Sequence, residues 1–145
     1  MTIPEPVLQL LNSQSEHLST LESLLADELK AITDRKLDDF QSILSKKTTL
    51  LNALQQTDQQ LAQQLSLTFP DYQSNQSFID KRSIIEGQLH KVKEMNEVNG
   101  KVIQSNQTTL LKFKELLFAS KGRKAMTYSA DGKAHRGPSD EVMKA

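Results

Sequence analysis

The stretch Leu11–Ile32, LNSQSEHLSTLESLLADELKAI, predicts the fold of this chain. Every seventh residue in it is apolar, namely Leu11, Leu18, Leu25 and Ile32. A repeat of seven keeps these side chains on one face of an α-helix and is typical of helices that pack side by side in bundles. We therefore expect a long helix from about Glu5 to Ile32, with Pro4 and Pro6 at its start, where a missing N–H costs little.

A second heptad pattern lies between about Asp34 and Leu67, and we expect Asp34 to cap its start. One apolar position is formed by Leu37, Leu44, Leu51 and Leu65, and the other by Phe40, Lys47, Leu54 and Leu61. Turn-forming residues from Ser66 to Ser77 then predict a break. Four apolar residues in or beside the break are expected to fold the connection back onto the end of the bundle: Leu67, Phe69, Tyr72 and Phe78.

The third helical pattern runs from about Ile79 to Ser120 with spacings that alternate four and three. Its seam reads Ile85, Leu89, Val92, Asn96, Asn99, Ile103, Asn106, Leu110, Phe113 and Leu117. A buried Asn at a seam fixes register and partner number at a cost in stability. Alternatively, this half of the helix is solvated, which leaves a loose bundle that a partner could complete. Gly87 and Gly100 inside the helix indicate either close packing or a kink.

The fold class that follows is all-α. We predict an antiparallel bundle of two to three long helices, a coiled-coil-like hairpin, because short connections place sequential helices side by side. Residues 1–120 form the bundle domain. Residues 121–145 are rich in small and charged side chains and poor in apolar ones, so we expect a mobile C-terminal tail there.

Composition excludes several function classes. The chain has 145 residues, 18 Lys plus Arg and 18 Asp plus Glu, so its overall charge gives no reason to expect nucleic acid as a partner. It has no Cys, which excludes disulfides and thiolate metal sites. No stretch approaches the roughly 18 apolar residues of a membrane span, and the N-terminus lacks a signal-peptide pattern. We expect a cytoplasmic protein without membrane insertion.

Catalytic chemistry is not indicated. The three His residues lie far apart in sequence, so no helical His pair for a metal exists, and no Gly-rich phosphate loop is seen. We therefore predict a protein that is not an enzyme and needs no cofactor. One alternative is a histidine phosphotransfer domain using His90, which falls one position off the seam and should face solvent. Glu94 stands where such domains carry Gly, and its carboxylate would repel a phosphoryl group.

The apolar stripe of the third helix widens from Leu110 to Phe118. Leu111 and Phe118 lie beside the seam, seven residues apart. A helix that is apolar nearly all round must be covered on more than one side. The other two helices could provide that cover; otherwise the stripe is an exposed patch that marks a partner site. Tyr128 stands alone in the tail, as the aromatic residue of a short docking motif does.

Three stretches in this order resemble the FlgN family of flagellar type III export chaperones. They are Ile43–Leu54 (ILSKKTTLLNAL), Asn96–Ile103 (NEVNGKVI) and Thr127–Gly132 (TYSADG). The likeness spans nearly the whole chain and rests on the combination, because Leu-, Lys- and Gln-rich helices are common.

The resemblance implies a cytoplasmic chaperone for the hook–filament junction proteins FlgK and FlgL. Such a chaperone binds the C-terminal amphipathic segments of these clients and delivers them to the export gate protein FlhA. The implied client-binding residues are Ile103, Asn106, Leu110, Leu111, Phe113, Leu117 and Phe118, and the implied gate-docking residue is Tyr128. The alternative is a structural coiled-coil oligomer, since the same seams could pair in a homodimer.

Overall fold

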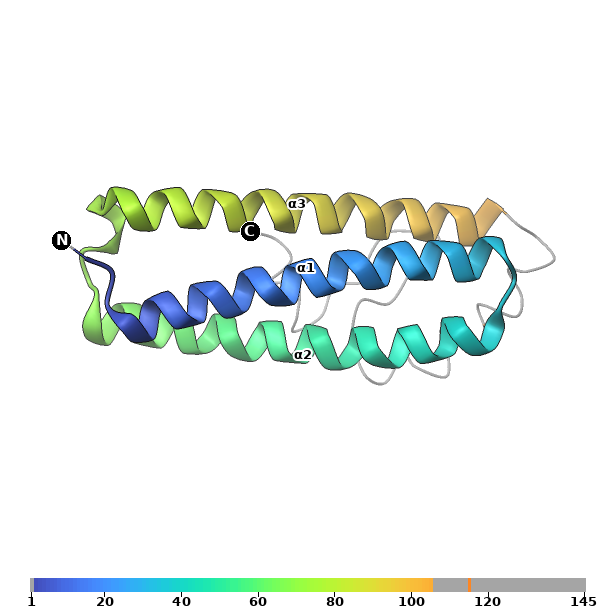
Figure 1. Cartoon of the computed structure of the whole chain (residues 1–145), viewed down its shortest axis with the longest axis horizontal. Helices are drawn as coiled ribbons and strands as arrows, with labels where there is room; N and C mark the ends of the chain where they lie inside the picture. Colours follow the sequence, from blue (N-terminus) through green and yellow to red (C-terminus); the bar gives the residue numbers. More distant parts are fainter. Residues whose placement is uncertain (1, 106–114, 116–145) are drawn as a thin grey trace.

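The computed structural model describes residues 2–105 and Glu115 and shows three long α-helices in the first of these ranges. They are α1 (Glu5–Thr33), α2 (Leu37–Thr68) and α3 (Gln76–Ser105), with a short 3₁₀ turn, η1 (Tyr72–Ser74), before α3. Successive helices run antiparallel, and α1 packs against both α2 and α3 (Figure 1). The all-α antiparallel bundle predicted from the sequence is confirmed.

The heptad leucines form the core. One apolar cluster fills the middle of the bundle (Leu18, Leu21, Leu25, Leu51, Leu54, Leu89, Val92). A second lies at the α1–α2 turn (Ala31, Ile32, Phe40, Ile43, Leu44, Ile103) and a third at the opposite end (Val7, Leu11, Leu61, Leu65, Phe69, Phe78). Because each helix contributes two positions per heptad to the middle cluster, three or four residues apart, the repeat of seven accounts for the packing.

The turn between α1 and α2 corrects the predicted start of the second helix. Asp34 ends α1 instead of capping α2, which begins at Leu37. Arg35 adopts a positive φ of 58°, and the N–H groups of Arg35 and Lys36 donate to the carbonyls of Ile32 (3.2 Å) and Ala31 (2.9 Å). This is the Schellman arrangement that ends helices, with Arg in the position that Gly usually occupies.

Replacing Arg35 with Gly is expected to raise the free energy of unfolding by about 0.5–1 kcal/mol, because Gly adopts the left-handed conformation without steric cost. Urea unfolding followed by circular dichroism measures the change. Lys36→Gly is the matched control: Lys36 has a φ of −94°, so Gly there relieves no strain. A gain from Arg35→Gly no larger than the effect of Lys36→Gly would contradict the prediction.

The connection between α2 and α3 is shorter than predicted. Helix α2 extends to Thr68, and α3 begins at Gln76, where the Asn75 side-chain oxygen accepts a hydrogen bond from the Phe78 N–H (2.9 Å). Phe69 and Phe78 meet edge to face with ring centroids 5.9 Å apart, and Tyr72 packs against Phe78 at 5.3 Å. These three aromatics do fold back onto the bundle. Leu67 does not; it is 70 % exposed because it still belongs to the outer face of α2.

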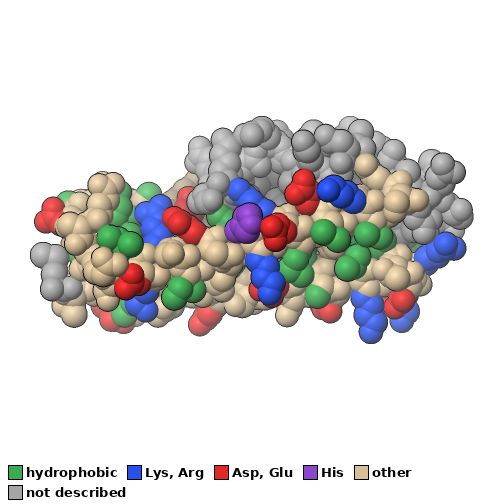
Figure 2. All heavy atoms as spheres, turned by 90° about the horizontal axis from the view of Figure 1, so that it is seen from above, with side chains coloured by type: hydrophobic (Ala, Val, Ile, Leu, Met, Phe, Trp, Pro, Cys, Tyr) green, Lys and Arg blue, Asp and Glu red, His purple; other side chains and the backbone are tan. Residues whose placement is uncertain are grey.

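The outer side of α3 carries charges of both signs. Figure 2 shows basic and acidic side chains interspersed over this side, with hydrophobic side chains in small groups between them. Lys91 pairs with Glu22 of α1 at 2.7 Å and Arg82 with Glu86 at 3.7 Å. A Cβ added at Gly87 would meet nothing within 4 Å, so this glycine does not serve close packing among the described residues.

None of the helices in the described part of the chain combines the length and apolar content that a bilayer crossing requires.

Candidate functional site

Of the predicted client-binding residues, only Ile103 lies in the described part of the chain. It is 2 % exposed and packs with Phe40, Ile43 and Ile32 at the α1–α2 end of the bundle. Ile103 thus anchors α3 in the core, and its contact with a client stays a prediction. Seven other predicted site residues lie outside the described residues: Asn106, Leu110, Leu111, Phe113, Leu117, Phe118 and Tyr128.

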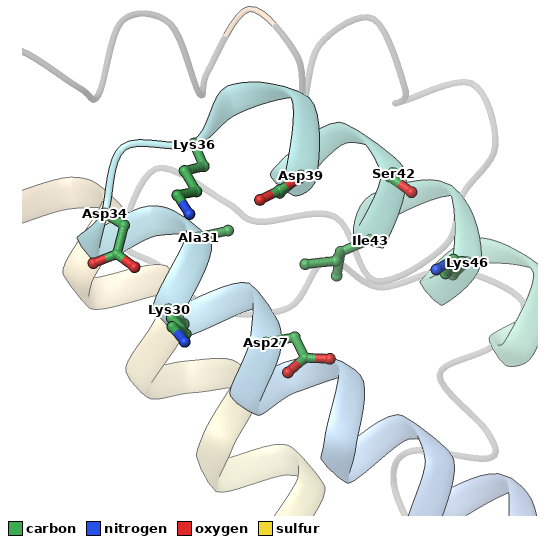
Figure 3. Close-up of a pocket in the computed structure, with 9 residues that line it drawn as sticks. All are labelled: Asp27, Lys30, Ala31, Asp34, Lys36, Asp39, Ser42, Ile43 and Lys46. Atoms are coloured by element: carbon green, nitrogen blue, oxygen red, sulfur yellow. The ribbon is translucent and has the colours of Figure 1, made fainter.

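A surface hollow of about 310 Å³ lies between α1 and α2 at the end of the bundle to which Ile103 belongs. Ala31 and Ile43 point into it from the two helices (Figure 3). Both belong to the core cluster that contains Ile103. The floor of the hollow is therefore an apolar surface continuous with the packing of α3.

Charged side chains border this hollow in equal numbers of each sign. Asp27, Lys30 and Asp34 come from the α1 side, and Lys36, Asp39 and Lys46 from the α2 side. Because the helices run antiparallel, Asp34 and Lys36 lie at the end of the hollow next to the α1–α2 turn. Asp27 and Lys46 lie at its other end, farther from the turn. A balanced border has no preference for anions or cations, so the hollow suits contact with a mixed-charge protein surface better than a phosphate or metal.

A layer of buried polar side chains crosses the bundle between the middle cluster and the cluster at the turn. Lys47 of α2 is 1 % exposed and Glu28 of α1 is 0 % exposed. The Lys47 Nζ lies 3.3 Å from Glu28 Oε2 and donates to Asn96 Oδ1 of α3 at 2.7 Å. Asn99 of α3 donates to Glu28 Oε1 and to the Leu25 carbonyl, both at 2.9 Å. The layer thus joins all three helices by hydrogen bonds.

The sequence left open whether the seam asparagines are buried or solvated, and the structure decides this for Asn96 and Asn99. Asn96 and Asn99 are buried at 1 % and 2 % exposure, so this part of α3 is packed and not solvated. Asn106 lies outside the described residues. Asn96 and Asn99 are hydrogen-bonded to the charged pair Lys47 and Glu28. Such buried amides fit the role of fixing the register of α3 against the other two helices.

Burial lowers the pKa of Lys47 below its ordinary value, because removal from water disfavours the ammonium form more than Glu28 stabilises it. The folded chain therefore releases this proton at a lower pH than the unfolded chain does. Between those two pKa values the unfolded state binds more protons, so the free energy of unfolding rises with pH there.

We expect this alkaline rise in the wild type and not in the variant carrying Glu28→Leu and Lys47→Met, which lacks the titrating group. Urea unfolding at a series of pH values below and up to the ordinary Lys pKa of about 10.5 measures both. The difference in unfolding free energy, wild type minus variant, should grow with pH. A constant or falling difference would show that the folded-state pKa is not lowered.

His90 is exposed, as its position off the seam predicts. Its side chain is 75 % exposed, and its Nε2 lies 3.0 Å from Glu94 Oε1. The carboxylate thus stands at the ring nitrogen that a phosphoryl donor would approach, and it would repel an incoming phosphoryl group. This geometry disfavours the phosphotransfer alternative.

Glu28 and the hollow are not among the features that the sequence pattern predicts. Glu28 follows Leu21 by seven residues, so the second heptad position of α1 could have placed it in the core opposite Lys47. The hollow has no such signal, because its walls belong to two helices whose separation depends on the packing of the whole bundle.

Comparison with known proteins gives one match. The family model described as FlgN protein matches residues 1–136 of the 145-residue chain. No curated protein and no solved structure matches. The match includes the described helices and also the segments that contain Leu110–Phe118 and Tyr128.

Proposed function

The chain belongs to the FlgN family, and from that premise we propose that it binds the C-terminal amphipathic segments of the junction proteins FlgK and FlgL and hands them to FlhA. The family is one of flagellar export chaperones, and we propose that this chain is not an enzyme. The family match over residues 1–136 carries the proposal. We further propose that the protein acts in the cytoplasm, with residues 1–120 as the bundle domain and 121–145 as the tail.

The structure supports a binding role at the α1–α2 end of the bundle. Ile103 ties α3 to the hairpin there, and the hollow beside it has an apolar floor and a charge-balanced border. The predicted client segment Leu110–Phe118 begins seven residues beyond Ile103 in the sequence. We propose that a client helix adds to the bundle through this segment, with its apolar stripe toward Leu111 and Phe118.

Binding of this kind needs no nucleotide or metal. A client terminus that is disordered alone loses conformational entropy when it folds on the chaperone, so it can bind specifically and still be released. Among residues 2–105 and Glu115, no group of three His, Asp or Glu side chains is placed to hold a metal ion.

The homodimer alternative has less support from the packing. The heptad leucines that would form an intermolecular seam, among them Leu18, Leu25 and Leu51, are buried within one chain. Pairing through these seams would require the helices to separate first. Light scattering at several concentrations distinguishes a monomer from an oligomer.

The experiment that tests the function is capture of purified C-terminal fragments of FlgK and FlgL by the full chain, with a flagellin C-terminal fragment as control. Binding of the FlgK and FlgL fragments and not of flagellin would support the proposal. Capture of neither junction-protein fragment at micromolar concentration would reject the proposal. A separate binding experiment with FlhA compares the wild type with Tyr128→Ala and tests the proposed docking residue.

A further inference from the structure

The buried polar layer stands between two apolar clusters in which the aliphatic contacts of α3 do little, by themselves, to select one axial position for the helix. On one side α3 contributes Leu89 and Val92 to the middle cluster, and on the other it contributes Ile103 to the cluster at the turn. Aliphatic side chains at a heptad repeat fit similar holes one repeat away. A slide of α3 by one heptad, about 10.5 Å at 1.5 Å per residue, would keep its apolar face toward α1 and α2.

The polar layer makes such a slide unfavourable. In the observed register, Asn96 accepts from Lys47 at 2.7 Å and Asn99 donates to Glu28 at 2.9 Å. A slide of seven residues in one direction would bring Leu89 and Val92 to the level of Lys47 and Glu28, and a slide in the other direction would bring Ile103 and Asn106 there. The buried pair would lose both amide partners in the first case. In the second it would lose the amide that accepts from Lys47, which is also a costly state for a buried charged group.

We propose that Glu28, Lys47, Asn96 and Asn99 form a register lock that holds α3 at one axial position on the α1–α2 hairpin. Each helix contributes to the lock, so sliding α3 breaks hydrogen bonds to both of the others. The lock sets the axial position of Ser105, the last described residue of α3. It thereby positions the predicted client segment, a consequence that rests on the proposed function.

The absence of Cys from the chain allows a direct test with introduced thiols. Ser15 Oγ of α1 donates to Gln88 Oε1 of α3 at 2.9 Å. In the variant with Ser15→Cys and Gln88→Cys, a short bifunctional maleimide should therefore cross-link the two thiols when α3 is in the observed register. Lys81 and Met95 lie seven residues to either side of Gln88. Ser15→Cys combined with Lys81→Cys or with Met95→Cys reports a slide of one heptad in each direction.

These reporters are placed in full-length chains with and without the lock. The apolar-layer variant carries Glu28→Leu, Lys47→Met, Asn96→Leu and Asn99→Leu. We expect the native layer to cross-link efficiently only through position 88. In the apolar-layer variant, intramolecular cross-linking through position 81 or 95 is expected to increase by about tenfold, because the population of the shifted register should increase by about that factor.

Two further variants keep the outcome interpretable. The variant with Asn96→Leu and Asn99→Leu keeps the Glu28–Lys47 pair but gives α3 an apolar seam at both positions. It should also gain the shifted cross-links, and it serves as the test if the fourfold variant does not fold. Lys46→Met removes an exposed neighbouring charge and should cross-link as the wild type does. Shifted cross-links that stay at the wild-type level in both folded layer variants would overturn the lock.

The same variants separate the lock from the function. If the register slides and the FlgK or FlgL fragment is captured less tightly, the lock positions the client segment. If no variant and no wild-type protein captures a fragment, the proposed function fails, while the cross-links still report on the lock.

Discussion

Replacing Lys47 with Met is expected to lower the free energy of unfolding by about 3–5 kcal/mol, the usual cost of removing one partner of a buried ion pair. The Lys47 ammonium lies 3.3 Å from a Glu28 carboxylate that is 0 % exposed and donates to Asn96 at 2.7 Å. Met fills the volume but donates no hydrogen bond, so a buried carboxylate loses its cation. Urea unfolding followed by far-UV circular dichroism gives the value.

The double change Glu28→Leu with Lys47→Met should restore most of this loss, because removing both charges removes the desolvation penalty along with the attraction. Lys46→Met serves as the control for loss of a lysine at the surface and should stay within about 0.5 kcal/mol of the wild type. If Lys47→Met is no more destabilising than Lys46→Met, the buried pair does not contribute as the geometry indicates.

Much of the fold could be predicted because one repeat governs it. Leu11, Leu18, Leu25 and Ile32 recur every seven residues and all are buried. This pattern depends on helix geometry and on the transfer of apolar surface from water, which are properties of local sequence. Even for Lys47, a charged residue, the spacing from Phe40 and Leu54 predicts a place on the seam, and Lys47 is buried there.

The helix ends were less predictable. Asp34 is a favourable N-cap in general, yet here the chain turns at Arg35 and α2 starts at Leu37. Capping preferences amount to about 1 kcal/mol, so packing of the hairpin can outweigh them. Leu67 and Phe69 show the same limit: the helix continues to Thr68, and only after it ends does the chain turn Phe69 inward.

The candidate site was predictable only where periodicity placed residues on one face. The heptad spacing predicts that Asn96 and Asn99 belong to the seam. It does not predict their partners, because Glu28 and Lys47 lie 71 and 52 residues before Asn99 in the sequence. The border of the hollow likewise depends on the distance between two helices. Such features require the tertiary arrangement and not the pattern of a single element.

Phe118→Lys and Leu111→Lys are each expected to weaken capture of the junction-protein fragment by about 30-fold or more, which corresponds to a hot-spot loss of about 2 kcal/mol. The two positions are seven residues apart on the widened apolar stripe, and a lysine there would place a charge against the apolar face of the client helix. Fluorescence anisotropy of a labelled FlgK or FlgL fragment measures the affinity.

The controls are Leu67→Lys and Ile84→Lys, which make the same change at described positions with 70 % and 65 % exposure. They lie on α2 and α3, outside the predicted client segment in the sequence, and variants at these positions should bind the fragment as tightly as the wild type. Circular dichroism must show that all four variants remain helical, so that lost affinity reports on the surface and not on unfolding. Equal affinity of Phe118→Lys, Leu111→Lys and the controls would remove this segment as the client site, because a charge cannot be buried in an apolar contact without cost.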